Sequence, residues 1–352
     1  MDMKKEVPKT KLAAFLLASV LLISFTFYFY QVFFTPNILV GKSDRLIVIR
    51  NDATFKGIQK QMADEGVVND MVSFSFVARL MGYDKQIKPG RYLLRADMSN
   101  REAVRALKMG RREAVKIVFT HVRLFDDLAE KITSKIGMTA DEFKDAVNRF
   151  VDSNQQGFTK DNILAMFIPN TYEVYFNITP EELVSKMNKE YTQFWNAERL
   201  AKAEKIGLTP IEVSILASIV QAESAKGEEA PIIAGLYLNR LKRGIPLQAD
   251  PTLIFALGDF TIKRVLNTHK EIDSPYNTYK YAGLPPGPVN MPYINTLEAV
   301  INAQDHKFIY MCAKEDFSGY HRFAETLSEH QVNARKYQKA LTEEIRKSKT
   351  QE

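Results

Sequence analysis

The sequence is poor in the residues that build disulfide frameworks and metal centres. It contains one cysteine, Cys312, in 352 residues, so no disulfide can form within the chain. Its five histidines show none of the spacings typical of metal ligands, and we expect neither a metal nor a cofactor. Cys312 lies in an apolar, strand-like stretch, which predicts an inert thiol in the core.

Blocks of basic residues are also missing. The net charge is only +6, and no zinc spacing or recognition motif accompanies it, so we expect no nucleic-acid partner. A surplus this small suits an anionic membrane surface or an acidic polymer without singling out either. With 45% apolar and 26% charged residues, the composition is that of a globular protein with about two folded units.

Charged side chains are absent between residues 12 and 41. The apolar run at 12–35 is long enough to cross a bilayer as a helix, which needs about 20 residues. Its aromatic-rich end, residues 27–34, suits a membrane interface. The run is longer than the core of a signal peptide, and no small-x-small cleavage site follows it. We therefore expect a retained single-pass transmembrane helix.

Basic residues flank this run on both sides, so charge alone does not orient it. Four lysines precede the run, and Lys42, Arg45 and Arg50 follow it. A short tail before an N-terminal anchor usually stays inside while a long domain is exported. We therefore expect residues 1–11 to form a cytoplasmic tail and the chain beyond the anchor to lie outside.

Residues 44–112 predict a small α+β module. Strand-like runs at 45–50 and 90–95 enclose two short helical patterns at 55–66 and 69–82. This strand–helix–helix–strand order is the pattern of a LysM-like domain. Such a module could bind glycan or could serve as a spacer, and the pattern does not decide between them.

The remaining chain, residues 113–345, predicts a larger mixed α/β domain. It begins with a β-branched strand at 113–120, followed by amphipathic helices at 124–137 and 139–150. The polar stretch 151–162 predicts an exposed loop. The whole chain is therefore expected to be of the α+β class.

A helix with a well-defined start lies in the middle of this domain. Thr209 is the expected N-cap, Pro210 takes the first helical position, and Glu212 completes a capping box. The 3.6-residue period then places Glu223 on the apolar stripe of this helix, near its C-terminal end. Burial and the negative end of the helix dipole would both raise the pKa of this carboxyl group.

A carboxyl group with a raised pKa suits a general acid, which must be protonated near neutral pH. The alternative is that the helix emerges into water at Gln221 and that Glu223 is an ordinary surface residue. On the pattern of this helix alone, both interpretations stay open.

Two further segments carry polar side chains on stiff backbone. In "LQADPT", Gln248, Asp250 and Thr252 bracket a proline turn, and Asp250 could either brace that turn or serve a site. Residues 273–292 contain five prolines and two glycines. They present tyrosines, an asparagine and a threonine with little entropy to lose, which suits a sugar-like ligand; a purely structural loop is the alternative.

These segments, read in order, resemble the endolytic murein transglycosylase family, also called YceG-like. The most specific parts are "LASIVQAES", "NRL", "GIPLQADPT", "SPYNTY", "GLPPGP" and a His-x-Phe…Glu-His run at 321–330. The resemblance extends from the predicted anchor to about residue 340. It implies that the catalytic glutamate is Glu223. The implied substrate-binding residues are Asn239, Gln248, Asp250, Thr252, Ser274, Tyr276, Asn277, Thr278, Tyr279, His321, Phe323, Glu329 and His330.

The resemblance also implies location and activity. It implies a bitopic protein of the bacterial inner membrane, with a LysM-like module before a periplasmic catalytic domain. The implied enzyme is a lytic transglycosylase, which cleaves nascent peptidoglycan strands internally and so terminates their elongation. Its expected partners are glycan strands, the cell membrane and a peptidoglycan synthase of the elongation or division machinery.

The sequence departs from the family pattern at three places. Gln221 replaces the first acid of an E-x-E pair whose second acid is Glu223. The family pattern has Glu-Arg before the next helix, and this sequence has Glu229-Ala230. The family pattern Pro-Thr-x-Ile-Tyr-Gly ends here in Phe255-Ala256. These departures leave open any role for an acid at 221 or an arginine at 230.

In the mechanism that the resemblance implies, Glu223 acts alone as acid and then as base. It protonates the oxygen that links MurNAc to GlcNAc, and then deprotonates the MurNAc C6 hydroxyl, which attacks C1 and leaves a 1,6-anhydro end. A muramidase-type hydrolase would need a second carboxylate, for which Asp250 and Glu329 are the candidates. A membrane-anchored, non-catalytic murein-binding scaffold is the remaining alternative.

Overall fold

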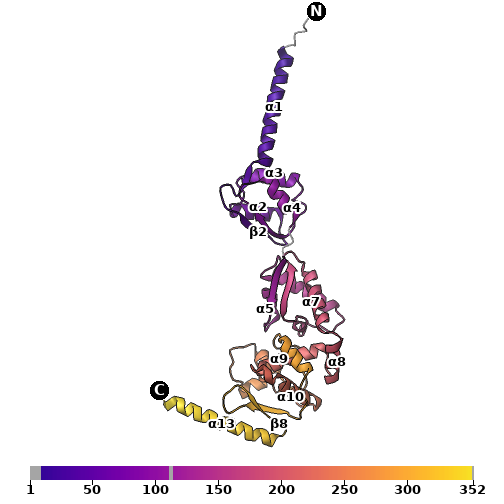
Figure 1. The fold of residues 1–352 in the computed structure, drawn as a ribbon, viewed down its shortest axis with the longest axis vertical. Coiled ribbons are helices and arrows are strands. Elements are labelled where there is room, and N and C mark those ends of the chain that lie inside the picture. The colour runs from indigo at the N-terminus through magenta and orange to yellow at the C-terminus, as the bar shows by residue number, and fades with distance from the viewer. Residues whose placement is uncertain (1–8, 111–113, 351–352) are drawn as a thin grey trace, which may run out of the picture. The chain divides into compact units, whose positions relative to one another are not determined.

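The structure is a computed structural model that describes residues 9–110 and 114–350 (Figure 1). Most of the predicted cytoplasmic tail therefore lies outside the described residues. The chain divides into two compact units. The first comprises residues up to 115 together with 135–138 and 173–179, and the second contains the rest.

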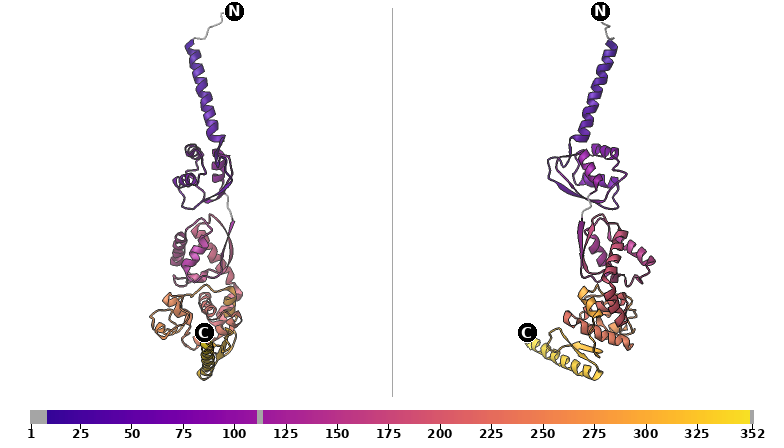
Figure 2. Two further views of the ribbon diagram at one scale, coloured as in Figure 1. Left: turned by 90° about the vertical axis from the view of Figure 1, so that its left-hand side faces the viewer. Right: turned by 45° about the vertical axis from the view of Figure 1, so that its right-hand side comes forward.

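The N-terminal helix α1 (Lys9–Phe34) agrees with the predicted apolar helix. The most apolar 18-residue window of this helix has a mean hydropathy of 2.3, and none of that window is buried inside the protein. In both views of Figure 2, α1 stands clear of the rest of its unit except at its C-terminal end. It is thus long and apolar enough to cross a membrane.

The first unit contains the predicted strand–helix–helix–strand order with additions at both ends. Its elements after α1 are β1 (Pro36–Ile38), β2 (Arg45–Ile49), α2 (Phe55–Asp64), α3 (Met71–Leu80), β3 (Gly90–Leu94), β4 (Met98–Ser99) and α4 (Asn100–Met109). Strands β2 and β3 pair antiparallel with Ile47 opposite Tyr92, and β1 pairs antiparallel with β4. Phe74 and Leu107 are among the side chains that fill the core between these strands and the helices.

Local sequence signals explain where these helices begin. Thr54 accepts a hydrogen bond from the backbone of Gly57 at the start of α2, and Asp70 accepts one from Val72 at the start of α3. Ser99 forms a capping box at the start of α4. Each side chain satisfies a backbone N–H group that has no partner inside its helix.

The chain after residue 113 is a mixture of helices with short two-stranded sheets. Its elements are β5 (Ala114–Phe119), α5 (Phe125–Thr133), α6 (Ala140–Ser153), β6 (Asn170–Tyr175), α7 (Pro180–Phe194), α8 (Ala197–Ile206), α9 (Pro210–Glu223), α10 (Ala230–Lys242), α11 (Asp250–Leu257), α12 (Ile294–Ile301), β7 (Tyr310–Ala313), β8 (His321–Ala324) and α13 (Leu327–Thr350). Strand β5 pairs with β6, and β7 pairs antiparallel with β8. The short 3₁₀ helices are Ile163–Met166, Gly227–Glu229 and Asn267–Glu271.

Helix α9 is the central helix of the second unit, where it contacts α10, α11 and α12. Figure 1 shows it beside α10. Thr209 caps it in the predicted capping box, and Pro210 is at its start. Every residue from 213 to 220 is buried. The helix is therefore buried all round rather than along one stripe, so periodicity alone could not have oriented Glu223.

Three local predictions need correction. The stretch 151–162 is not wholly an exposed loop, because α6 continues to Ser153 and Phe158 is buried. The Asn154 side chain closes the following turn by bonding the backbone of 156 and 158. The segment 250–252 starts helix α11 instead of forming an isolated turn, since Pro251 is tolerated in a first helical turn. Cys312 lies in a strand as predicted, but it is only half-buried.

Candidate active site

Glu223 is the last residue of α9 and lines a cavity of about 430 Å³. The helix ends there because Ser224 takes an extended conformation. Helices α10 and α11, the strand β7 and the start of α13 supply the other walls. The lining residues are Glu223, Leu236, Tyr237, Arg240, Leu247, Gln248, Asp250, Tyr279, Tyr310, Met311, Cys312, Ala313, His321, Leu327 and His330.

A buried tyrosine holds the Glu223 carboxyl group. Tyr237 on α10 donates a hydrogen bond from Oη to Glu223 Oε1 at 2.7 Å, and its ring is buried in the core. This bond favours the ionised form of Glu223 and also fixes the direction of the carboxyl group.

The pKa of Glu223 is raised to about 7. Removal of the carboxyl group from water is the largest cause, and the negative charge of Asp250 adds to it. The hydrogen bond from Tyr237 and the positive charge of Arg240 act in the opposite direction. The predicted rise is confirmed, and the charge of a second carboxylate, which was not predicted, adds to the effect of burial.

Asp250 lies in the first turn of α11 and lines the same cavity. Tyr279, from the proline-rich segment, donates a hydrogen bond from Oη to Asp250 Oδ1 at 2.5 Å. Burial, followed by this contact with a carboxylate, raises the pKa of Tyr279. Tyr279 therefore remains a protonated donor beside an ionisable group in the cavity wall.

Arg240 is a buried cation that organises the backbone around the cavity. Its Nε donates to the carbonyl oxygen of Ile309 at 2.6 Å, and its Nη1 donates to the carbonyl oxygen of Leu247 at 2.8 Å. Nη1 also lies 3.3 Å from Oε1 of Gln248, a residue with a φ of 54°. These bonds fix the chain that carries Gln248 and also place positive charge near Glu223.

Two histidines complete the wall. His321 Nδ1 lies 2.9 Å from Oε2 of the buried Glu229, whose Oε1 accepts the His321 backbone N–H at 2.8 Å. His330 on α13 stacks on Tyr310 with ring centroids 5.2 Å apart. Burial and the charge of Arg240 lower the pKa of His330, so its ring is neutral at neutral pH.

The YceG-like family model matches residues 47–336 of this sequence. The chain belongs to the YceG-like family. Two Streptococcus pneumoniae proteins are each 27% identical over 282 residues, which is 70% of this chain and 50% of the relative. A Bacillus subtilis protein is 34% identical over 160 residues, 45% of this chain and 42% of the relative. All three are named endolytic murein transglycosylase. The chain spans about half the length of these curated relatives.

A solved structure supports the same relationship. The crystal structure of a yceG-like protein from Listeria monocytogenes is 25% identical and superimposes with a TM-score of 0.52. The similarity covers 82% of this chain and 98% of that one. It therefore extends over most of the fold as well as the sequence.

Only part of the predicted residue set lines the cavity of this YceG-like protein. The predicted residues that do so are Glu223, Gln248, Asp250, Tyr279, His321 and His330. They come from α9, the start of α11, the proline-rich segment, β8 and α13. The structure thus brings together five segments that are spread over more than a hundred residues of sequence.

A second group of predicted residues fastens the proline-rich segment to α11. The Oγ1 atoms of the buried Thr252 and Thr278 are 2.8 Å apart, and Thr278 Oγ1 accepts the backbone N–H of Ala249. The buried Asn277 donates from Nδ2 to the carbonyl oxygens of Lys270 and Ile272. These side chains hold Tyr279 and Asp250 in place instead of facing the cavity.

The other predicted residues also lie outside the cavity lining. Asn239 donates to the carbonyl oxygens of 306 and 308, and Phe323 stacks on the ring of residue 308. Glu329 accepts backbone N–H groups at the start of α13. Ser274 accepts the backbone N–H of Tyr276, whose ring packs against that of residue 255.

The sequence interpretation missed Tyr237, Arg240, Tyr310 and Cys312 as cavity residues. One signal was available for the first two. An arginine three residues after a tyrosine, in a helix that is mostly apolar, indicates a charge close to the core that needs partners. The other two lie in a strand whose partners depend on tertiary packing.

Gln221 stands where the family pattern has an acid, and its hydrogen-bond partners differ from those of Glu223. Its Nε2 donates to Asn290 Oδ1 at 3.0 Å and to the carbonyl oxygen of Met291 at 3.2 Å. Its Oε1 accepts the backbone N–H of Tyr293 at 2.6 Å. A carboxylate could accept but not donate, so the amide suits this position in this chain.

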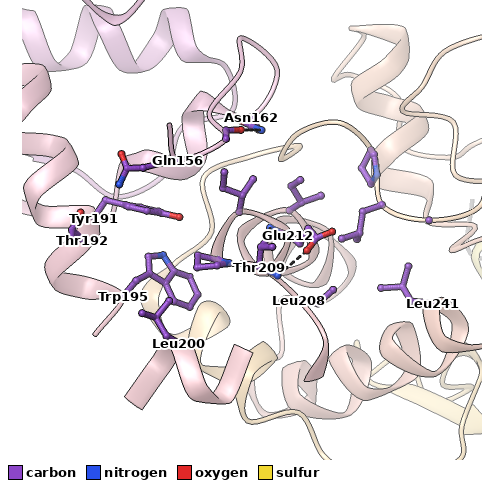
Figure 3. A pocket seen from close by; sticks show the side chains of 17 residues that line it. Gln156, Asn162, Tyr191, Thr192, Trp195, Leu200, Leu208, Thr209, Glu212 and Leu241 are labelled. Carbon is purple, nitrogen blue, oxygen red and sulfur yellow. Dashed lines mark hydrogen bonds between the residues drawn. The ribbon is translucent and has the colours of Figure 1, made fainter. Parts of the chain in front are cut away.

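A larger cavity, of about 860 Å³, lies around the N-terminal end of α9 (Figure 3). Trp195, Tyr191 and Leu200 line one side of it. Its one carboxylate, Glu212, is used in the capping box with Thr209. That carboxylate thus has a structural role at the helix start, so the smaller cavity, which contains Glu223, is the candidate active site. Among the described residues, no group of His, Cys, Asp and Glu side chains could hold a metal ion.

Proposed function

We propose that this chain is a membrane-anchored endolytic lytic transglycosylase of peptidoglycan. It cleaves the bond between MurNAc and GlcNAc within nascent strands, leaves 1,6-anhydro-MurNAc ends and so terminates strand elongation. The observation that carries the proposal is a carboxyl group with a pKa of about 7, held by a buried tyrosine at the wall of a cavity. The names of the relatives point to the same activity.

Glu223 performs both proton transfers in this mechanism. Protonated Glu223 gives its proton to the glycosidic oxygen as the bond from that oxygen to C1 breaks. The resulting carboxylate removes the proton of the MurNAc C6 hydroxyl, whose oxygen forms the new bond to C1. The carboxyl group regains its proton, so the reaction consumes no water and needs no second carboxylate. A pKa of about 7 suits both directions of transfer at neutral pH.

The neighbouring groups bind and orient the sugar rings. Tyr237 stabilises the carboxylate formed after the first proton transfer. Gln248, Tyr279 and His321 present donors and acceptors along the cavity wall, which suits the hydroxyl and acetamido groups of an amino sugar. Thr252, Asn277 and Thr278 act indirectly, since they hold the proline-rich segment.

A muramidase-type hydrolase is the second candidate. Asp250 lines the same cavity and raises the pKa of Glu223, so a second carboxylate is present beside the acid. Retaining glycosidases separate the two carboxyl groups by ~5–5.5 Å and inverting ones by ~6.5–9.5 Å. The bond from Tyr279 occupies one oxygen of Asp250, which favours a positioning role. Glu329 is used at the start of α13 and does not line the cavity.

The cellular setting belongs to the same proposal. Helix α1 anchors the chain in the bacterial inner membrane, with the short tail in the cytoplasm and residues 113–345 as a periplasmic catalytic domain. Residues 44–112 are a LysM-like module between them. A peptidoglycan synthase of the elongation or division machinery is the proposed protein partner. The apolar length of α1 and the family membership support this arrangement.

Product analysis tests the reaction. Detergent-solubilised full-length protein and its Glu223→Gln variant are incubated with isolated peptidoglycan, and the products are analysed by mass spectrometry. Anhydro-MurNAc ends from the wild type alone are expected. Reducing MurNAc ends would show that the protein is a hydrolase and not a transglycosylase. Full activity of Glu223→Gln would show that Glu223 is not the catalytic residue. A complete lack of products from the folded wild type would favour a non-catalytic murein-binding scaffold.

A further inference from the structure

Helix α3 is apolar on two opposite faces. One face packs into the core of the first unit through Phe74 and Val77, which are fully buried. On the other face, Val72, Phe76 and Leu80 follow one another at helical spacing and are 78%, 53% and 62% exposed. The helix contains no acidic residue. A helix that is apolar all round normally lies in a protein core or against lipid.

This exposed stripe lies beside the end of α1, on the same unit. The last turn of α1 is part of the core of that unit, because Val32 and Phe33 are buried in it. Asn100 on α4 donates from Nδ2 to the carbonyl oxygen of Val32 at 2.9 Å. The ring of Phe33 meets the ring of Phe76 edge to face, with centroids 6.4 Å apart. Figure 1 shows α3 at the end of the unit from which α1 emerges.

This packing couples the position of α3 to that of α1. If α1 crosses the membrane, its C-terminal turn reaches the membrane surface, because the hydrocarbon core needs about 20 residues of helix. The contacts of Phe33 and Val32 leave no flexible linker between that turn and the unit. The stripe is therefore carried at the level of the lipid headgroups.

The chemistry around the stripe matches a bilayer interface. Phe34, at the end of α1, lies under the guanidinium group of Arg101 with 5.4 Å from Cζ to the ring centroid. Arg79 lies on α3 beside Leu80 and also borders a shallow groove of about 740 Å³ with Phe76 and Val72. Basic side chains beside an apolar surface suit the level of the lipid headgroups, where guanidinium groups meet phosphates.

We propose that the exposed face of α3, formed by Val72, Phe76 and Leu80, inserts into the outer surface of the membrane that α1 crosses. The occupant of this face is thus lipid, and the first unit rests on the bilayer in one fixed orientation. This inference rests on the proposed anchor and goes beyond it, because an anchor alone would allow any orientation of the unit.

Tryptophan fluorescence in lipid vesicles tests the proposal on the full-length chain. The sequence has one tryptophan, Trp195, whose emission in the parent chain is the baseline to subtract. Phe76→Trp and Leu80→Trp place a reporter on the stripe at two exposed positions that accommodate the larger ring. Leu22→Trp, on α1, reports insertion of the anchor. Leu93→Trp, on β3, is the matched control because its side chain is 50% exposed in the same unit.

The protein is reconstituted into vesicles of phosphatidylethanolamine and phosphatidylglycerol, with and without brominated acyl chains. We expect the added tryptophans at 76, 80 and 22 to emit at shorter wavelength and to lose most of their emission to the brominated lipid. The tryptophan at 93 should keep its emission. Quenching at 22 without quenching at 76 and 80 would overturn the docking of α3 while leaving the anchor in place.

Two other results would also overturn the proposal. A lack of quenching at all four positions would show that α1 is not inserted, so the anchor and the docked helix would fail together. Equal quenching at 76 and 93 would indicate adsorption of the unit without a preferred face. The position dependence of the quenching therefore separates failure of the inference from failure of the proposed anchor.

Discussion

Replacement of Tyr237 by Phe removes a single hydroxyl group and tests the origin of the Glu223 pKa. Tyr237 donates to Glu223 Oε1 at 2.7 Å and thereby stabilises the ionised carboxylate. A hydrogen bond to a charged group contributes about 1.5–3 kcal/mol, and about 1.4 kcal/mol corresponds to one pKa unit. We expect the pKa of Glu223 to rise from about 7 by about one to two units in Tyr237→Phe.

The pH dependence of the initial rate at low substrate measures this change, since it reports the free enzyme. Glu223 must be protonated to donate its proton, so the rate should fall on the alkaline side around pH 7 in the wild type. In Tyr237→Phe this fall should move to higher pH. The rate on the acidic plateau should decrease, because the acid is weaker and the carboxylate formed after proton transfer has lost its donor.

Tyr310→Phe is the matched control. It removes another hydroxyl from the same cavity, while the partner of Glu223 remains Tyr237. Its pH profile should superimpose on that of the wild type. A Tyr237→Phe profile that also superimposes, or that moves to lower pH, would refute the assignment of Glu223 as an acid tuned by Tyr237.

Three further predictions concern Glu223, Asp250 and Gly287. The fold raises the pKa of Glu223 from 4.5 to about 7, so the contribution of this group to stability is complete below pH 4.5 and is lost as the pH rises through about 7. Between those pH values the free energy of unfolding of Glu223→Gln should rise by about 3 kcal/mol relative to that of the wild type, as measured by denaturation at each pH. Asp250→Asn removes a negative charge that raises the pKa of Glu223, so the alkaline fall in rate should move to lower pH; an unchanged profile would contradict the coupling. Gly287→Ala places a Cβ 1.8 Å from the carbonyl oxygen of Asp161, so the melting temperature should fall strongly or the chain should fail to fold. Gly283→Ala is the control with the smaller expected effect, because its Cβ meets no atom within 4 Å and the substitution is strained only by a φ of 96°.

Elements with strong local signals could be predicted closely from the sequence. The capping box at Thr209 begins its helix where predicted, and the helix expected at 139–150 begins at Thr139, because a cap satisfies backbone groups within four residues of itself. The apolar helix α1 is equally local in origin. The fold class and the existence of the βααβ order follow from the same periodicities.

Predictions failed where burial depends on packing that composition and periodicity do not show. The polar stretch after α6 contains a buried aromatic ring and turns bonded by asparagine side chains, and composition predicts only its polarity. The expected single apolar stripe of α9 was too narrow, because every residue from 213 to 220 is buried. For a helix that is apolar on all sides, periodicity does not predict which face packs against which neighbouring helix.

The sequence by itself placed Glu223 near the C-terminal end of an apolar helix and predicted that a stiff polar segment follows it. Only the tertiary structure decided what the carboxyl group meets there. Tyr237 approaches it from α10, Asp250 and Tyr279 from segments further along the chain, and Arg240 from within the core. The pKa of an acid depends on desolvation and on charges within a few ångströms. Those neighbours are set by how the helices pack and not by their order in the chain.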